Sequence, residues 1–166
     1  MDPFAFSETQ TTIRDLMRDV ARKDFAPRAR ALDEAGAFPT ENVRKLAELG
    51  LLGITVPEAL DGAGADSLSF ALALEELAKV CGSTCLTLAA HTSLGTMPIV
   101  LFGSESLKKR YVPSNARGET IGAYGLTEPA AGSDSSATQT RACAWGWQRG
   151  PAARPYRSVS TRCSRC

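Results

Sequence analysis

The sequence predicts a mainly α protein: a helical bundle, then a first strand of a β-domain, then an irregular tail. Three observations support this prediction. Apolar residues recur at helical spacing through most of residues 1–118. Alanine and leucine, which favour helices, are plentiful, whereas aromatic residues make up only 7%. The sequence pattern changes after residue 118. With 43% hydrophobic residues, a sizeable core can form, and global disorder is not expected.

The first helix is predicted to begin after Ser7 and to run to about Arg30. Ser7 and Gln10 have the spacing of a capping box. Apolar residues follow at helical spacing, with charged residues on the opposite face. Pro27 is expected to kink or stop this helix, because proline has no N–H to donate.

The second and third helices are marked by end signals. One is predicted from Pro39 to Gly50, and Gly50 suits a left-handed C-terminal cap. A turn-rich loop over residues 57–66 follows, and Asp66 or Ser67 is expected to cap the third helix.

Residues 84–102 form the most hydrophobic segment and are long enough to span a membrane. Polar residues inside it raise the cost of membrane insertion, so we expect no span and a helix buried in a soluble bundle. His91, the only histidine, is expected to be a hydrogen-bonded core residue and not a catalyst. A further helix is predicted to begin after Ser104, and Pro113 and Gly118 are expected to close the helical part.

Residues 119–126 fit a strand better than a helix, and residues 127–134 fit a turn. One strand cannot satisfy its own backbone groups, so we expect its sheet to lie further along the chain. The predicted organisation is a helical domain over 1–118, the start of a β-domain over 119–142, and a tail over 143–166.

The tail differs sharply in composition from the rest of the chain. It carries both tryptophans and three of the five cysteines, and residues 149–166 hold five arginines and no acidic residue. We interpret the tail as a shifted reading frame, which sequencing the gene through codon 142 would test. A natural disordered basic tail is the alternative. Cys163 and Cys166 have a metal-ligand spacing, but a zinc site needs a second pair, so no metal site is expected.

The net charge bears on which partners are expected, and the cysteine content bears on the cellular compartment. A net charge of +1 gives no electrostatic case for nucleic acid or an anionic membrane. Five cysteines, an odd number, and a start without a secretory signal predict a cytoplasmic protein. Glu75, Glu76 and residues 108–110 are expected to be solvated or ion-paired helix faces.

The segment Tyr124–Asp134 is the candidate functional site. Gly132 has no Cβ, so its backbone can approach a bulky anion closely. Ser133 and the N–H groups around it can form an anion-binding concavity. Thr127 can hydrogen-bond to the edge of a planar ring. These residues suit a phosphate-bearing cofactor, and an ordinary Gly/Ser/Pro turn is the alternative.

The pattern Gly-Leu-Thr-Glu-x-x-x-Gly-Ser-Asp at residues 125–134 resembles the signature of the acyl-CoA dehydrogenase family. Other stretches, including residues 46–54 and 93–99, resemble the family in the same order, over roughly residues 6–142. The resemblance implies an N-terminal helical domain, a middle β-domain that binds FAD, and a C-terminal helical domain, usually in tetramers. Asp61 departs from the family, which usually has glycine there.

The resemblance also implies residue roles. Five residues would belong to the first FAD-contacting segment: Tyr124, Leu126, Thr127, Gly132 and Ser133. Ser133 would also lie near the acyl-CoA substrate. Family members remove an α-proton with a carboxylate, pass a hydride to the flavin, and then pass electrons to an electron-transfer flavoprotein. No counterpart of that carboxylate is found here, so no catalytic residue is assigned, and the chain alone is predicted to be inactive.

Two other interpretations remain open. The chain could be a non-catalytic helical module that packs on partner proteins, or a fragment of a flavin oxidase or monooxygenase with the same fold.

Overall fold

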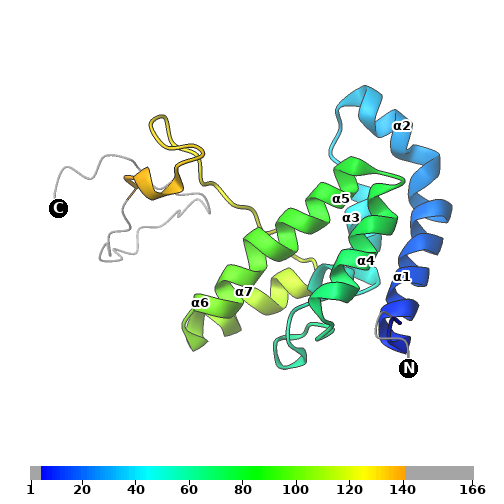
Figure 1. Ribbon diagram of the computed structural model, residues 1–166, viewed down its shortest axis with the longest axis horizontal. Helices are drawn as coiled ribbons and strands as arrows, with labels where there is room; N and C mark the ends of the chain where they lie inside the picture. Colours follow the sequence, from blue (N-terminus) through cyan, green and yellow to red (C-terminus); the bar gives the residue numbers. More distant parts are fainter. Residues whose placement is uncertain (1–4, 141–166) are drawn as a thin grey trace, which may run out of the picture. The chain divides into compact units, whose positions relative to one another are not determined.

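The computed structural model describes residues 5–140, which divide into a helical unit ending at Tyr124 and a short second unit beginning at Gly125 (Figure 1). The tail predicted over residues 143–166 lies outside the described residues. The Cys163/Cys166 pair lies there too, and so does the segment to which the frame-shift hypothesis applies.

The chain begins with one long helix made of three parts. These are α1 (Glu8–Val20), a π-helical segment (Ala21–Phe25) and α2 (Ala26–Ala35). The predicted capping box is confirmed, because the Gln10 N–H donates to Ser7 Oγ at 3.2 Å and the Ser7 N–H donates to Gln10 Oε1 at 2.9 Å.

Pro27 does not stop this helix, which continues past Arg30 to Ala35. The Ala26 N–H donates to the Ala21 carbonyl, five residues back, so the α-helical pattern is already interrupted before the proline. Pro27 therefore lies in the first turn of α2, where its missing N–H leaves no bond unmade.

Helices α3 (Thr40–Glu48) and α4 (Ser67–Ala78) follow, joined by two short 3-10 turns, Leu51–Gly53 and Glu58–Leu60. Gly50 has φ +70°, which confirms the predicted left-handed cap. Asp66 is the cap of α4, because its Oδ1 accepts the Ser69 N–H at 2.6 Å. Helix α4 packs along α1 (Figure 1).

A second long helix repeats the arrangement of the first. It consists of α5 (Gly82–Ala89), a π-helical segment (Ala90–Thr96) and α6 (Met97–Phe102). Pro98 lies at the start of α6, as Pro27 does in α2.

Helix α7 (Glu105–Ala116) begins at the Ser104 cap, whose Oγ accepts the Leu107 N–H at 3.4 Å. Of the two residues predicted to close the helical part, Pro113 lies inside this helix, which continues to Ala116, and Gly118 follows its end with φ +74°. A proline three residues from the end of a helix removes one backbone hydrogen bond. Only one turn follows Pro113, so this single loss does not end the helix.

The helix Gly82–Phe102 is, among residues 5–140, the one that is long and apolar enough to cross a membrane, with a mean hydropathy of 1.5. It was expected to be buried inside the bundle, and this is correct for one side only. Leu88 and His91 are fully buried, whereas Leu86 and Phe102 are 70% and 85% exposed. The described residues pack against one face of this helix.

The core of the helical unit is built from large side chains of several elements. Met17, Phe25, Leu46, Leu52 and Leu77 are fully buried within it. Burial of each such side chain contributes about 1.5–3 kcal/mol. A smaller cluster of Val56, Val112 and Ala116 joins α7 to the 3-10 turns.

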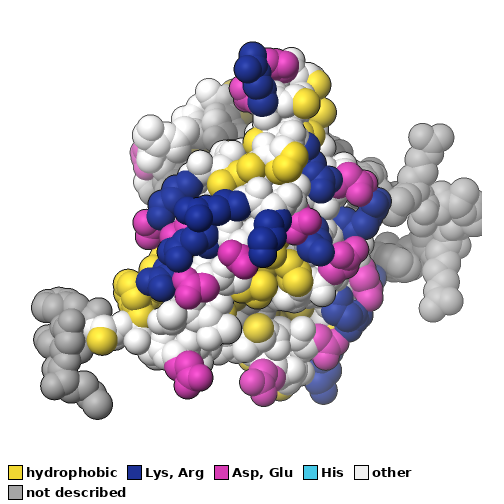
Figure 2. Space-filling model, turned by 90° about the vertical axis from the view of Figure 1, so that its right-hand side faces the viewer, with side chains coloured by type: hydrophobic (Ala, Val, Ile, Leu, Met, Phe, Trp, Pro, Cys, Tyr) yellow, Lys and Arg dark blue, Asp and Glu magenta, His cyan; other side chains and the backbone are white. Residues whose placement is uncertain are grey.

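The surface carries interspersed charges of both signs. Figure 2 shows basic and acidic side chains next to one another over one face of the molecule. Many form pairs one helical turn apart, such as Lys23 with Asp19 and Arg44 with Glu41.

The predicted strand over residues 119–126 is not formed. The segment is irregular, and within residues 5–140 the only β-type pairing is an isolated bridge between Glu128 and Ala131. A strand requires a neighbouring strand to accept its hydrogen bonds, and the described residues offer none to this segment.

Candidate functional site

The predicted cofactor residues fall on both sides of the boundary between the two units. Tyr124 is the last residue of the helical unit and is 56% exposed. Leu126, Thr127, Gly132 and Ser133 belong to the second unit, and all are partly or fully exposed.

The second unit contains a tight turn at Pro129 and Ala130. The Glu128 N–H donates to the Ala131 carbonyl at 2.9 Å, and the Ala131 N–H donates to the Glu128 carbonyl at 3.1 Å. These two reciprocal bonds confirm the turn predicted over residues 127–134. Pro129 fixes one dihedral at the tip, which lowers the entropy lost on ordering the turn.

Glu128 closes the loop that follows the turn. Its carboxylate accepts the Gln139 N–H at 2.8 Å, the Thr140 N–H at 2.9 Å, and the Thr140 hydroxyl. The Thr140 hydroxyl and then the two N–H groups lower the pKa of Glu128, because each stabilises the ionised form. Sequence reasoning assigned no role to this residue, since nothing in the sequence pairs an acid at 128 with amides eleven and twelve residues later.

Asp134 organises the other end of the loop. Its Oδ1 accepts the Ser136 N–H at 3.1 Å and also the Ser136 hydroxyl, at the start of a 3-10 turn, Ser135–Ala137. The turn and the loop therefore each have an acidic side chain that binds backbone N–H groups.

The predicted contact residues are left free by this arrangement. Neither the Thr127 hydroxyl nor the Ser133 hydroxyl bonds to any other residue among those described. A Cβ added to Gly132 would meet no atom within 4 Å, and Gly132 is not in the left-handed region. Neither packing nor φ within the described residues thus requires glycine at 132, and the space beside its backbone is open to a bulky anion.

His91, in the π-helical segment Ala90–Thr96, contacts the backbone just before the site. It is fully buried, and its Nδ1 accepts the Gly122 N–H at 2.9 Å. Burial lowers the pKa of His91, because it disfavours the charged ring. The backbone groups of Asn115 and Leu52 act in the opposite direction and raise this pKa, but by less. The expectation of a core histidine is confirmed for its burial and for the bond at Nδ1, whereas Nε2 has no hydrogen-bond partner among the described residues.

The other candidate groups have structural roles. Glu76 pairs with Arg18 at 2.9 Å, and Glu75 pairs with Lys79 at 2.9 Å, as expected for an ion-paired helix face. Lys108 pairs with Glu105. In residues 5–140 no three His, Cys, Asp or Glu side chains are grouped as metal ligands, and both Cys81 and Cys85 are free thiols.

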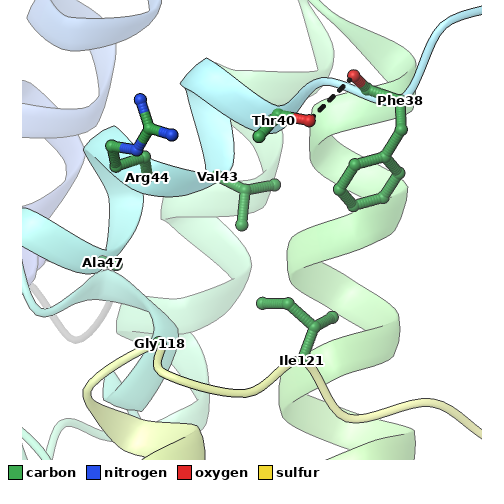
Figure 3. Close-up of a pocket in the computed structure, with 7 residues that line it drawn as sticks. All are labelled: Phe38, Thr40, Val43, Arg44, Ala47, Gly118 and Ile121. Atoms are coloured by element: carbon green, nitrogen blue, oxygen red, sulfur yellow. Dashed lines mark hydrogen bonds between the residues drawn. The ribbon is translucent and has the colours of Figure 1, made fainter.

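A shallow groove of about 250 Å³ lies on the helical unit, and none of the predicted contact residues lines it (Figure 3). The side chains of Phe38, Val43 and Ile121 point into it. Arg44 at its edge is already paired with Glu41. The full lining is Phe38, Thr40, Val43, Arg44, Ala47, Gly118 and Ile121. Because its lining is mostly apolar, it lacks the convergent polar groups of a catalytic pocket.

Residues 7–119 match the N-terminal domain family of acyl-CoA dehydrogenases. The chain belongs to the acyl-CoA dehydrogenase family. It is 45% identical over 143 residues to a probable acyl-CoA dehydrogenase of Bacillus subtilis. The aligned residues make up 86% of this chain and 38% of that relative. The chain therefore spans about two fifths of the length of this relative.

Solved structures show the same fold. One chain of a structure described as the electron-transferring flavoprotein of Acidaminococcus fermentans is 44% identical, with a TM-score of 0.80 over 84% of this chain and 37% of its own. An acyl-CoA dehydrogenase of Bacillus anthracis, solved with FAD, is 38% identical, with a TM-score of 0.76 over 84% of this chain and 24% of its own.

The structure also explains the departure at Asp61 from the acyl-CoA dehydrogenase pattern. Asp61 has φ +64°, and it is the one non-glycine residue with positive φ among residues 5–140. Glycine adopts this conformation freely, and aspartate is among the residues that tolerate it. The loop therefore keeps a glycine-like backbone with an acidic side chain, which pairs with Arg117.

Proposed function

We propose that this chain is part of an FAD-dependent acyl-CoA dehydrogenase. In this proposal Tyr124, Leu126, Thr127, Gly132 and Ser133 provide its first flavin-contacting segment. The observation that carries the proposal is the open space beside Gly132, in a loop whose Thr127 and Ser133 hydroxyl groups make no bond to other described residues. Membership of the family supplies the cofactor that fits this chemistry.

The chain's own residues would hold and orient the cofactor. The Thr127 hydroxyl would donate to the edge of the flavin ring, and Gly132 and Ser133 would face the diphosphate. Glu128 would keep the turn closed, so that these groups are already in place before binding, which reduces the ordering cost. When bound, FAD supplies the redox chemistry by accepting a hydride from the acyl chain.

The remaining functional assignments are also proposals. The substrate is an acyl-CoA thioester, with Ser133 close to it. The electron acceptor is an electron-transfer flavoprotein, the whole protein is a tetramer, and it works in the cytoplasm. Since no catalytic base is assigned among the residues of this chain, we expect the chain alone not to turn over acyl-CoA.

An FAD titration of the purified 166-residue chain tests the proposal. The amide NMR signals of residues 124–133 should shift saturably with weak affinity, while the absorbance shows no stoichiometric flavin and an assay shows no turnover. Gly132→Ala should remove most of the shift, because its Cβ fills the open space. Gly82→Ala is the matched control, since a Cβ there also meets no atom within 4 Å.

The outcomes separate the two parts of the proposal. Wild-type chain that gives no shift at millimolar FAD would refute the flavin contact. Stoichiometric yellow protein that oxidises acyl-CoA would refute the prediction that the chain alone is inactive.

A non-catalytic interaction module is the second candidate function. The exposed apolar side chains on the helical unit favour it, above all Leu86, Leu101 and Phe102. Size-exclusion chromatography distinguishes the two: a specific, saturable complex with a longer relative would support the module, and a monomer that responds to FAD would not. A same-fold flavin oxidase or monooxygenase would need sequence beyond this chain to be told apart.

A further inference from the structure

The backbone just before the flavin-contacting segment lies directly against the π-helical segment Ala90–Thr96. A Cβ placed on Gly95 would lie 2.5 Å from the Gly122 carbonyl carbon and 2.9 Å from the Ala123 nitrogen. In the other direction, a Cβ on Gly122 would lie 2.9 Å from Gly95 Cα. Neither glycine has a positive φ. It is therefore the close approach of two backbones that requires glycine at both positions.

His91 adds a directional bond to this contact. Its Nδ1 accepts the Gly122 N–H at 2.9 Å, and the histidine is fully buried. Since Nδ1 accepts, the proton of the neutral ring is on Nε2, which has no partner among the described residues. The bond to Gly122 is thus the hydrogen bond by which this ring holds the stretch of backbone before Tyr124, and burial shields it from water.

A second set of bonds holds the same stretch of backbone two residues earlier. The Thr120 hydroxyl donates to Asn115 Oδ1 at 2.6 Å, and Asn115 Nδ2 donates to Thr96 Oγ1 at 3.2 Å. Thr96 and Asn115 are both buried. Residues 120–123 are therefore attached at two points to the π-helical segment, at His91 and at Thr96.

We propose that His91 is a positioning residue for the flavin-contacting segment. Together with Gly95 it fixes the backbone at Gly122, two residues before Tyr124, the first residue of the segment. The inference rests on the proposed flavin contact of residues 124–133. It gives the buried histidine a role toward the cofactor through the backbone, without any contact between the ring and FAD.

The test uses the 166-residue chain and three variants of one helix. His91→Phe keeps an aromatic ring but removes the acceptor, His91→Asn restores an acceptor near Nδ1, and Gly95→Ala pushes the Gly122 backbone away while leaving His91 intact. Gly82→Ala, in the same helix but facing open space, is the control. Two measurements are made on each: hydrogen exchange of the Gly122 amide, and the FAD-induced shifts at Thr127 and Ser133.

We expect His91→Phe to speed exchange of the Gly122 amide about tenfold, the change that loss of one hydrogen bond produces. The apparent affinity for FAD should fall several-fold in His91→Phe and in Gly95→Ala, and return toward wild type in His91→Asn. Gly82→Ala should match wild type. A purely structural role would lower the urea midpoint without changing the FAD response of the folded chain.

The failures can be told apart. If wild-type chain responds to FAD and His91→Phe and Gly95→Ala respond equally, the positioning role is overturned and the proposed function stands. If wild-type chain does not respond to FAD, the proposed function fails, and this inference fails with it.

Discussion

Glu76 on α4 is the acidic side chain that joins this helix to α1. It is only 7% exposed, and the Arg18 guanidinium donates to both of its oxygens, Nε to Oε2 at 3.1 Å and Nη2 to Oε1 at 2.9 Å. Lys79 adds a bond at 3.0 Å. The bond from Arg18, more than that from Lys79, lowers the pKa of Glu76 to about 2 from an ordinary 4.5, against the opposing effect of burial.

Replacing Glu76 with glutamine is expected to lower the free energy of unfolding by about 2 kcal/mol. A pKa of about 2 in place of 4.5 corresponds to about 3 kcal/mol, at about 1.36 kcal/mol per pKa unit. Arg18 is 33% exposed, so solvent screening reduces this value. Because the pKa is lower in the folded state, the contribution is complete above pH 4.5 and is lost as the pH falls toward 2.

Urea denaturation followed by circular dichroism at 222 nm measures the effect at pH 7 and at pH 3. Glu75→Gln is the matched control, since Glu75 is 61% exposed and pairs only with Lys79 among the described residues. We expect it to change the stability by less than about 0.5 kcal/mol. The reasoning is refuted if the two variants unfold alike at pH 7, or if the deficit of Glu76→Gln is as large at pH 3 as at pH 7.

Two further predictions concern glycine and the site loop. Gly118→Ala should destabilise the chain by about 2–3 kcal/mol, and more than Gly50→Ala at about 1 kcal/mol. Both glycines have positive φ, +74° at Gly118 and +70° at Gly50. Only a Cβ at Gly118 would meet another atom, Ala47 Cβ at 2.5 Å, whereas a Cβ at Gly50 would meet none within 4 Å. Thermal unfolding checks this, and equal losses would contradict the steric argument. Glu128→Gln should speed hydrogen exchange of the Thr140 amide about tenfold, because a neutral acceptor binds N–H groups less strongly. An unchanged rate would show that the carboxylate does not close the loop.

The helix starts and caps could be predicted because their signals are local. Ser7 with Gln10, Gly50, and Asp66 each act within three or four residues of their own position. The effects of Pro27 and Pro113 could not be predicted. Each depends on how the neighbouring turns are bonded, a π-helical segment before Pro27 and a single remaining turn after Pro113.

The candidate site was predictable where a contiguous motif carries it. The turn after Thr127 and the open position at Gly132 follow from the family-like pattern of residues 125–134. The bonds that hold the site could not be predicted, because they join residues far apart in sequence: His91 with Gly122, and Glu128 with Thr140. The strand over residues 119–126 was wrong because strand formation is decided by a partner, and composition says nothing of where that partner is.

The two π-helical segments have a consequence for length variation between relatives. A π-helical stretch takes up about one residue more than an α-helix with the same number of turns. If one residue is deleted within Ala90–Thr96, the helix can therefore close into continuous α-helix, and the apolar faces of α5 and α6 stay in register. The same deletion inside α5 or α6 would rotate one part of the helix by about 100° relative to the other. A deletion between His91 and Gly95 would be tolerated in folding, yet it would shorten their spacing by one residue and so change the geometry of their shared contact with Gly122.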